Sequence, residues 1–367
     1  MTRRLGLILL LASTLSGQEI YDLLLKNGQV IDSANHRNGR FDVAVRGNKI
    51  VRVARDLPAA HARVVIDAGQ YYVTPGLIDI NARFSVRDPD RGTRADPRCL
   101  SNGVTTAVDS GSASWKDFEA WKASVIDRSK VRVLALLNMS GNNVEATAGI
   151  SRLYPQLIPG VFAEGDVELA IKAAELTKGF VMTEGDAQAG RLRPGDIVTH
   201  VYGKNLQPWM EAARARGILF DVGQGSNGFS FRVAVPAIRR GFLPDTVSSG
   251  IDNSANALPL AGMMDSMSKL LNIGVTLEQI VQRATENPAR AIRRADLGAL
   301  SEGAVADIAL LEIQRGNFGF LDSGHTKLPG ATRLRCVLTV RNGAIVWDSE
   351  GLAATDSIKA GPYSNFK

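Results

Sequence analysis

Hydrophobic and polar residues alternate with a period of two near both ends of the chain, which is typical of half-buried strands. In the N-terminal part, these runs are Tyr21–Leu25, Phe41–Val45, Lys49–Val53 and Arg63–Ile66. In the C-terminal part, they are Ala306–Glu312, Cys336–Val340 and Ala344–Trp347. Turn residues rich in Asn and Gly separate several runs, as in Lys26-Asn27-Gly28, Arg46-Gly47-Asn48-Lys49 and Arg341-Asn342-Gly343. Because short Asn/Gly turns join antiparallel strands, both ends are predicted to form antiparallel β-structure.

Between these ends, short apolar strands are followed by stretches with helical periodicity. The predicted strands are Val73–Ile80, Val104–Asp109, Val131–Asn138, Gly160–Glu164, Phe180–Glu184, Ile197–Tyr202, Ile218–Val222 and Thr246–Gly250. The predicted helices are Trp115–Ile126, Val167–Lys178, Gln207–Arg216, Phe231–Arg240 and Leu277–Ala284. Apolar strands that alternate with helices indicate a parallel sheet, and eight of them in this length predict a (β/α)8 barrel within an α/β fold.

The first residues have the pattern of a targeting segment. Thr2-Arg3-Arg4 is cationic, Leu5–Leu15 is apolar, and Ser13-Thr14-Leu15-Ser16-Gly17 supplies small residues for cleavage. The apolar run is too short for a stable membrane anchor, so residues 1–17 are predicted to be a secretory signal peptide. We therefore expect export to the periplasm or beyond, with no membrane anchor after cleavage.

The charge and cysteine content narrow the range of partners. The formal net charge is +6 over 367 residues, and aromatic residues make up 6% of the chain. Lys and Arg are scattered, so neither a basic stripe nor a stacking platform for nucleic acid is expected. Cys99 and Cys336 are the only cysteines. Two separate thiols are the favoured interpretation, and a disulfide between them is the alternative that export leaves open.

One motif carries most of the information about family. Asp67-Ala-Gly-Gln-Tyr-Tyr-Val-Thr-Pro-Gly-Leu-Ile-Asp79 is an apolar strand opened by Pro-Gly and closed by Asp. Further motifs follow in order, namely Gly103–Gly111, Leu192–His200, Leu219–Ser226, Phe229–Arg232, Gly241–Ser249 and Thr285–Arg290. Together they resemble the metal-dependent amidohydrolase superfamily, in its deacetylase and dihydroorotase-like branch. After the predicted signal peptide at 1–17, the resemblance implies a barrel at 73–300 and a small β-sandwich domain combining 18–72 with 301–367.

The same resemblance locates the metal-ligand positions. After the first barrel strand the superfamily has His-x-His, and this chain has Asn81 and Arg83. An amide offers only a weak carbonyl donor, and a guanidinium stays protonated and repels a cation. On the fourth strand, the superfamily's bridging lysine corresponds to Phe162, which has no donor atom.

At the remaining ligand positions, one residue type is changed, one is retained and one is lost. Glu184 stands where the superfamily has a histidine on strand five, and His200 keeps the ligand of strand six. The general base expected after strand eight is replaced by Gly250. The replaced and retained ligand positions are thus Asn81, Arg83, Phe162, Glu184, His200 and Gly250. We further expect the Arg83 guanidinium to occupy the vacated metal region and to pair with Glu184 or Asp252. Glu184 would then be a buried carboxylate in a salt bridge.

Three interpretations follow. The first is an exported amidohydrolase-fold protein that has lost hydrolysis of amide or cyclic amide C–N bonds, needs no cofactor and binds a small polar ligand. The second is an active hydrolase with a rebuilt site, in which Glu184, His200 and Asp252 hold one Zn²⁺ or another divalent metal. The third is an assembly scaffold, for which self-association into a homo-oligomer is the only partner that the resemblance suggests.

Overall fold

The computed structural model describes residues 20–84, 94–139, 143–185, 189–204, 206–252 and 262–360. The predicted signal peptide, residues 1–17, lies outside these ranges. No helix in the described ranges is both long enough and apolar enough to cross a membrane.

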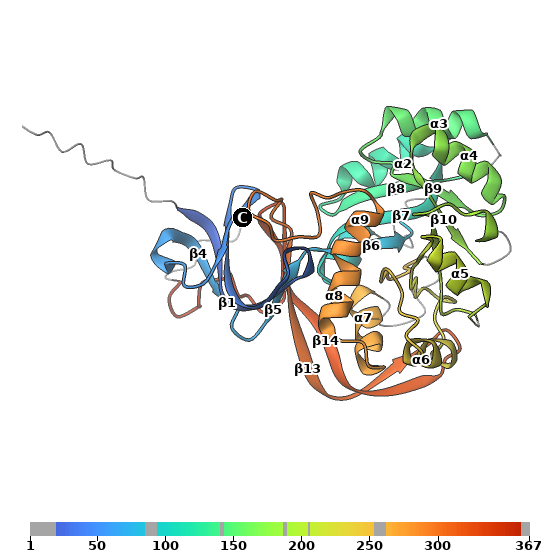
Figure 1. Cartoon of the computed structure of the whole chain (residues 1–367). Coiled ribbons are helices and arrows are strands. Elements are labelled where there is room, and N and C mark those ends of the chain that lie inside the picture. Colours follow the sequence, from blue (N-terminus) through green and yellow to red (C-terminus); the bar gives the residue numbers. More distant parts are fainter. Residues whose placement is uncertain are drawn as a thin grey trace, which may run out of the picture.

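A curled parallel sheet forms the centre of the larger part of the molecule (Figure 1). Its seven strands follow the order β12-β11-β10-β9-β8-β7-β6. Their bounds are β6 Leu77–Ala82, β7 Val104–Ser114, β8 Arg132–Asn138, β9 Gly160–Ala163, β10 Phe180–Glu184, β11 Ile197–Thr199 and β12 Leu219–Phe220. Parallel bridges from Asp221 to Thr246 and from Ala82 to Ile251 join the two edges through the segment 246–251. The sheet therefore closes as the predicted TIM-like barrel.

The predicted eighth strand, Thr246–Gly250, is present only as these two bridges. Within it, the hydroxyls of Ser248 and Ser249 donate to buried carboxylates, and Gly250 has a left-handed φ of 62°. These features interrupt the regular ladder, because a left-handed residue cannot continue an extended strand.

Helices cover the outside of the barrel (Figure 1). They are α1 Ala95–Leu100, α2 Phe118–Ser124, α3 Val144–Leu153, α4 Val167–Thr177, α5 Trp209–Ala215, α6 Phe231–Arg239, α7 Met263–Asn272, α8 Leu277–Ala284 and α9 Glu286–Ala291. All five predicted helices are found, and α8 has the predicted bounds. A capping box between Thr276 and Gln279 fixes its start.

The first predicted barrel strand is split between two sheets. β5 (Tyr72–Pro75) pairs with strands of a second sheet, which both chain ends build, and β6 begins after Gly76. A Cβ atom at Gly76 would lie within 3.0 Å of the Thr105 side chain, so a glycine is needed for this close approach.

Both chain ends build the second sheet, in the order β15-β14-β13-β5-β1-β2-β3, with β4 paired to β1. The bounds are β1 Tyr21–Asp32, β2 Arg37–Arg46, β3 Lys49–Ala54, β4 Ala62–Asp67, β13 Ile308–Leu321, β14 Lys327–Arg341 and β15 Ala344–Asp348. The sheet is mixed rather than wholly antiparallel, since β1 runs parallel to β4 and β5. Lys26-Asn27-Gly28 is a bulge inside β1, not the expected turn.

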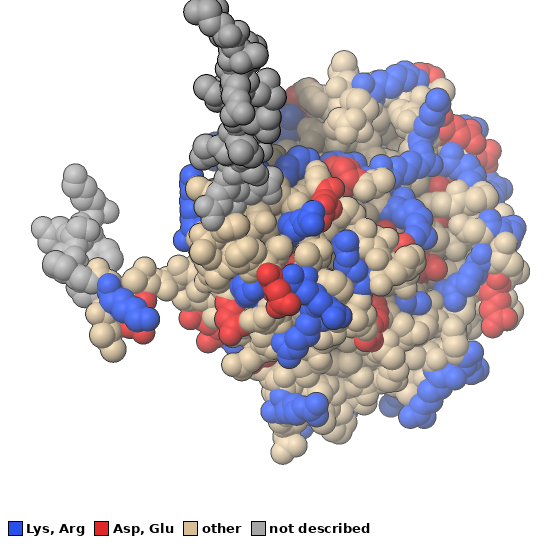
Figure 2. Space-filling model, turned by 60° about the vertical axis from the view of Figure 1, so that its left-hand side comes forward, with Lys and Arg blue, Asp and Glu red and all other residues tan. Residues whose placement is uncertain are grey.

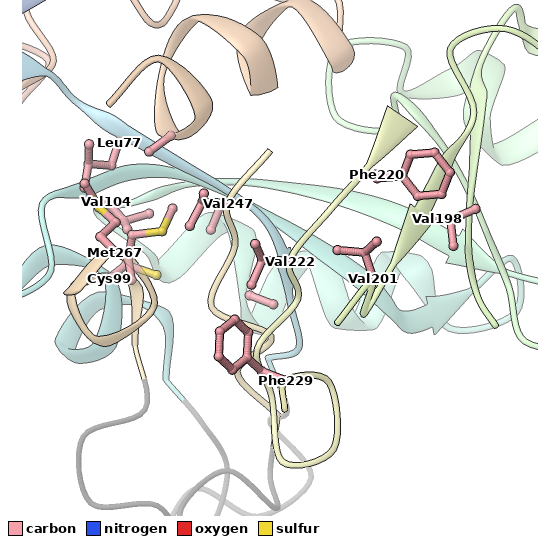
Figure 3. Packing of buried hydrophobic residues seen from close by; sticks show 14 of the residues in the cluster. Leu77, Cys99, Val104, Val198, Val201, Phe220, Val222, Phe229, Val247 and Met267 are labelled. Carbon is pink, nitrogen blue, oxygen red and sulfur yellow. The ribbon is translucent and has the colours of Figure 1, made fainter. Parts of the chain in front are cut away.

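Buried residues of the barrel sheet pack against the surrounding helices (Figure 3). Leu77, Val104, Cys99 and Met267 lie close together at one end of this cluster in Figure 3. Cys99 and Cys336 are both buried and both free. On the face of the molecule shown in Figure 2, basic and acidic side chains are interspersed.

Candidate functional site

A cavity of about 490 Å³ opens at the carboxyl ends of the barrel strands. Most of the side chains singled out from the sequence line it, namely Asn81, Arg83, Glu184, His200, Gly250 and Asp252. Phe162 lies next to it, beneath the Arg83 guanidinium, with Cζ of Arg83 5.0 Å from the ring centroid. The structure therefore brings the predicted positions together, as expected for the active-site face of this type of barrel.

Arg83 is the cation at the centre of the site. Its Nη2 lies 3.3 Å from Oε1 of Glu164 and 3.6 Å from Oε1 of Glu184, and its Nε donates to the Ser110 carbonyl at 3.0 Å. The predicted pairing with Glu184 is confirmed. Glu164 was missed, although it is the last residue of the predicted fourth strand, where side chains reach the mouth of the barrel.

These ion pairs are not deeply buried. The side chains of Arg83, Glu164 and Glu184 are 36%, 51% and 50% exposed. Water therefore screens their charges, and the expectation that Glu184 would be a buried carboxylate is wrong.

Glu184 also holds His200. Nε2 of His200 lies 3.2 Å from Oε1 of Glu184, and Nδ1 of His200 donates to the Gly223 carbonyl. Burial alone lowers the pKa of His200, but the hydrogen bond and negative charge of Glu184 outweigh it and raise that pKa above its ordinary value. The hydrogen bond from His200 in turn lowers the pKa of Glu184. Since both ring nitrogens face acceptors, the pair favours an imidazolium and a carboxylate.

Asn81 is buried, and both the oxygen and the nitrogen of its amide form hydrogen bonds. The Ser110 hydroxyl donates to Oδ1 of Asn81 at 2.5 Å, and Nδ2 of Asn81 donates to Oγ1 of Thr199 at 2.7 Å. Thr199 then donates to the Asp221 carboxylate at 2.8 Å. The amide oxygen thus serves a hydrogen-bond chain within the barrel.

The general-base position has no room for a side chain. Gly250 has φ of 62°, and a Cβ there would come closer than 3.0 Å to the Gly225 nitrogen and the Gly223 carbonyl carbon. Backbone hydrogen bonds hold this contact, from Gly225 to the Ser249 carbonyl and from Gly250 to the Asn81 carbonyl, both at 2.9 Å. The loop Gly223–Gly228, which we call the glycine loop, therefore packs directly on the strand-eight segment.

Three buried aspartates support the floor of the site. Asp79 accepts hydrogen bonds from the backbone and hydroxyl of Ser249, and Asp221 accepts one from Ser248. Burial raises the pKa of Asp79 to about 7 and that of Asp109 to about 6, and it also raises the pKa of Asp221. Each ends or follows an apolar strand in the sequence, a signal that could have identified them. They brace neighbouring strands and do not line the cavity.

The donor set does not fit a divalent metal. The Asn81 amide is already bonded on both sides, Phe162 has no donor, and the Arg83 guanidinium lies against the two carboxylates nearest to it. Within the described ranges, His, Cys, Asp and Glu side chains form no group of three that could hold a metal ion. Asp252 lines the cavity but does not complete such a group with Glu184 and His200.

Comparisons with known proteins agree with this fold. A sequence model described as the amidohydrolase family matches residues 244–347. A deacetylase of Brucella anthropi is 27% identical over 356 residues, which cover 84% of this chain and 89% of the relative. A deacetylase of Agrobacterium fabrum is 28% identical, with coverage of 77% and 81%.

Among solved structures, a dihydroorotase superposes with a TM-score of 0.79 at 26% identity, covering 89% of this chain and 99% of that one. An adenine deaminase gives a TM-score of 0.80 at 22% identity, a likeness of fold alone. The barrel, the ordered motifs and these similarities support membership of this chain in the amidohydrolase superfamily. Within that superfamily the chain is deacetylase-like, so the resemblance noted in the sequence is confirmed.

Proposed function

We propose that this chain is an exported amidohydrolase-fold protein that has lost metal-dependent hydrolysis and binds a small polar ligand at the mouth of its barrel. The observation that carries the proposal is the position of Arg83. Its guanidinium stacks on Phe162 and faces Glu164 and Glu184. A fixed positive charge therefore stands among the side chains that, in the superfamily, surround a metal.

The remaining groups are poorly suited to activate water. Hydrolases of this superfamily use a metal to generate hydroxide near neutral pH. Here the general-base position is Gly250, against which the glycine loop packs. His200 is a poor base because Nδ1 donates to a carbonyl while Glu184 stabilises the protonated ring. The pair of Glu184 and His200 is therefore better suited to contact a polar ligand than to accept a proton from water.

The cavity suits a ligand with a carboxylate or an amide. Its volume of about 490 Å³ is in the range of small-molecule sites. The Arg83 guanidinium has N–H donors in a planar fork that matches a carboxylate, and Lys204 adds a second cation to the lining. N-acylated amino acids carry both groups, and the similarity to deacetylases favours this class.

The decisive experiment measures metal and turnover on the same preparation. The protein lacking residues 1–17 is purified without chelator, titrated calorimetrically with Zn²⁺ and Mn²⁺, and incubated with a panel of N-acetyl amino acids while released amine is measured. We expect no stoichiometric ion and no turnover, with saturable binding of at least one member of the panel that Arg83→Gln weakens.

The opposite outcome is equally clear. About one ion per chain, lost in His200→Ala and kept in the control variant His61→Ala, would refute the proposal if amine is also released. That result would support the rebuilt site of Glu184, His200 and Asp252. His61 is a suitable control because it lies in the β-domain, outside the cavity.

A further inference from the structure

A second hollow, of about 440 Å³, lies at the opposite end of the barrel. Its walls come from the last turns of α3 and α4, the segments that lead into β9 and β10, and the residues after α9. β10 begins beside this hollow at Phe180 and ends at the barrel mouth with Glu184. We call the hollow the basal pocket, lined by Leu134, Ser151, Arg152, Pro155, Gln156, Ile158, Pro159, Leu176, Thr177, Lys178, Gly179, Ile292, Arg293 and Arg294.

The lining of the basal pocket contains four cations and no carboxylate. Arg294 is neutralised by Asp296 at 2.7 Å, and Arg293 donates to the backbone carbonyl of Lys178. Among the described residues, the side chains of Arg152 and Lys178 form no ion pair. The positive charge of the pocket is therefore largely uncompensated.

Nearby carboxylates supply only part of the missing charge. A smaller hollow of about 280 Å³ shares Lys178 and Arg293 with the basal pocket and contains Glu175 and Asp196. Both acids face Arg193, at 3.9 Å and 3.0 Å. The two carboxylates and this guanidinium together carry one net negative charge, so they offset only part of the positive charge of Lys178, Arg293 and Arg152.

Two of these cationic residues, Lys178 and Arg293, have a backbone conformation that favours glycine. Lys178 and Arg293 both have a φ of 57°, in the left-handed region where a side chain is disfavoured. Lys178 is the C-cap of α4, a position that is most often glycine. Cations also favour helix C-termini, which is a purely structural reason for their presence. The test below separates this reason from ligand binding.

Part of the pocket wall is apolar. Leu176, which is 42% exposed, and Pro155 present accessible apolar surface, whereas Leu134, Ile158 and Ile292 are 1%, 5% and 2% exposed and are already packed within the protein. An anionic group at the cations would thus be adjacent to a surface that favours a hydrocarbon or aromatic body.

We propose that the basal pocket binds a small organic anion, whose carboxylate or phosphate faces Arg152, Lys178 and Arg293 and whose apolar body contacts Leu176 and Pro155. This site is separate from the barrel mouth and does not depend on the function proposed there.

The experiment uses 1-naphthyl phosphate as the probe in calorimetric titrations of the whole chain. Inorganic phosphate tests the anionic group alone, and 1-naphthol tests the apolar body alone. We expect one saturable site for the probe, with affinity at least about tenfold higher than for either fragment, because both parts of the pocket are then occupied.

Variants identify the site. Arg152→Gln and Lys178→Gly should each weaken the probe about fivefold to tenfold, as expected for one charge-assisted contact in a partly exposed site. Lys178→Gly suits the left-handed backbone, so its fold should be retained. Lys172→Gln is the matched control, since Lys172 lies on α4, pairs with Glu168 and is not in the lining. Its affinity should be unchanged.

Several outcomes would overturn the proposal. One is the absence of saturable binding. Another is a lower melting temperature in Arg152→Gln with unchanged affinity, which would assign the cations to the helix ends alone. Loss of probe binding in Arg83→Gln would locate the probe at the barrel mouth instead. Equal affinity for inorganic phosphate would remove the apolar part of the site.

Discussion

Replacing Arg83 by alanine removes every contact that holds the cation in the barrel mouth. The hydrogen bond from Nε to the Ser110 carbonyl contributes about 1 kcal/mol in this partly exposed setting. Each half-exposed ion pair, with Glu164 and with Glu184, adds about 0.5 kcal/mol. Stacking on Phe162 adds roughly another 0.5 kcal/mol. Arg83→Ala should therefore lower the free energy of unfolding by about 2–3 kcal/mol.

This magnitude is smaller than the one expected for a buried ion pair. Removing one partner of a buried pair costs roughly 3–5 kcal/mol because it leaves a charge without solvent. Here both glutamates stay half exposed after the substitution and regain water. For a chain of 367 residues, an unfolding entropy of about 2.1 cal/mol/K per residue converts the loss into a melting temperature about 3–4 °C lower.

The assay is thermal and chemical unfolding of Arg83→Ala, Glu164→Gln and the double variant. The double-mutant cycle should give a coupling of about 0.5 kcal/mol between Arg83 and Glu164. Arg63→Ala is the control, because Arg63 forms a single pair with Asp22 at 3.2 Å and is 72% exposed, so its effect should be smaller. An unchanged melting temperature in Arg83→Ala, or zero coupling in the cycle, would refute the reasoning.

Four other measurements probe the same fold. Gly250→Asp should lower the free energy of unfolding by about 2–4 kcal/mol in denaturant titrations, because the added Cβ would clash with the glycine loop and the backbone φ at this position is left-handed. The variant should also bind no Zn²⁺, and a stable variant that binds zinc would contradict this. Glu184→Gln should lower the pKa of His200, as measured by NMR titration of the imidazole. In the wild type, the raised pKa of His200 stabilises the fold fully below pH 6.5, the ordinary pKa of histidine, and this stabilisation is lost as the pH rises through the folded-state pKa. The lowered pKa of Glu184 stabilises the fold above pH 4.5, the ordinary pKa of glutamate, and this stabilisation is lost as the pH falls through the folded-state pKa. A free energy of unfolding that is independent of pH in both ranges would count against the pair. Cys99 and Cys336, whose thiol pKa values burial raises, should react with a thiol reagent only after denaturation, and rapid labelling of the native protein would show that they are accessible.

The barrel could be predicted because its strands are short, apolar and regularly spaced. Periodicity identified β6 to β12 to within a few residues, although β11 and β12 are shorter than expected. Periodicity gave the wrong strand bounds where tertiary contacts determine the path of the backbone. Val73–Ile80 reads as one strand, yet Gly76 divides it between two sheets because it must approach Thr105 closely. No local pattern reveals that contact.

The sequence predicted which residues lie in the candidate site better than it predicted the contacts and exposure of their side chains. The resemblance located Arg83 and His200 correctly, and the charges alone suggested the pair between Arg83 and Glu184. It could not show that Glu164 would reach the same guanidinium, since this depends on the relative rotation of neighbouring strands. Nor could it show how exposed these carboxylates are, which sets the size of the stabilisation.

Under the function proposed above, single substitutions toward the superfamily's ligands should not restore a metal site, because the packing around these positions opposes them. Asn81→His would break the amide bridge from Ser110 to Thr199, and Thr199 donates to Asp221. Gly250→Asp would need the glycine loop to move away, yet that loop provides the carbonyl that orients His200. The change at 250 would therefore also disturb His200, so we expect neither substitution to create a metal centre by itself.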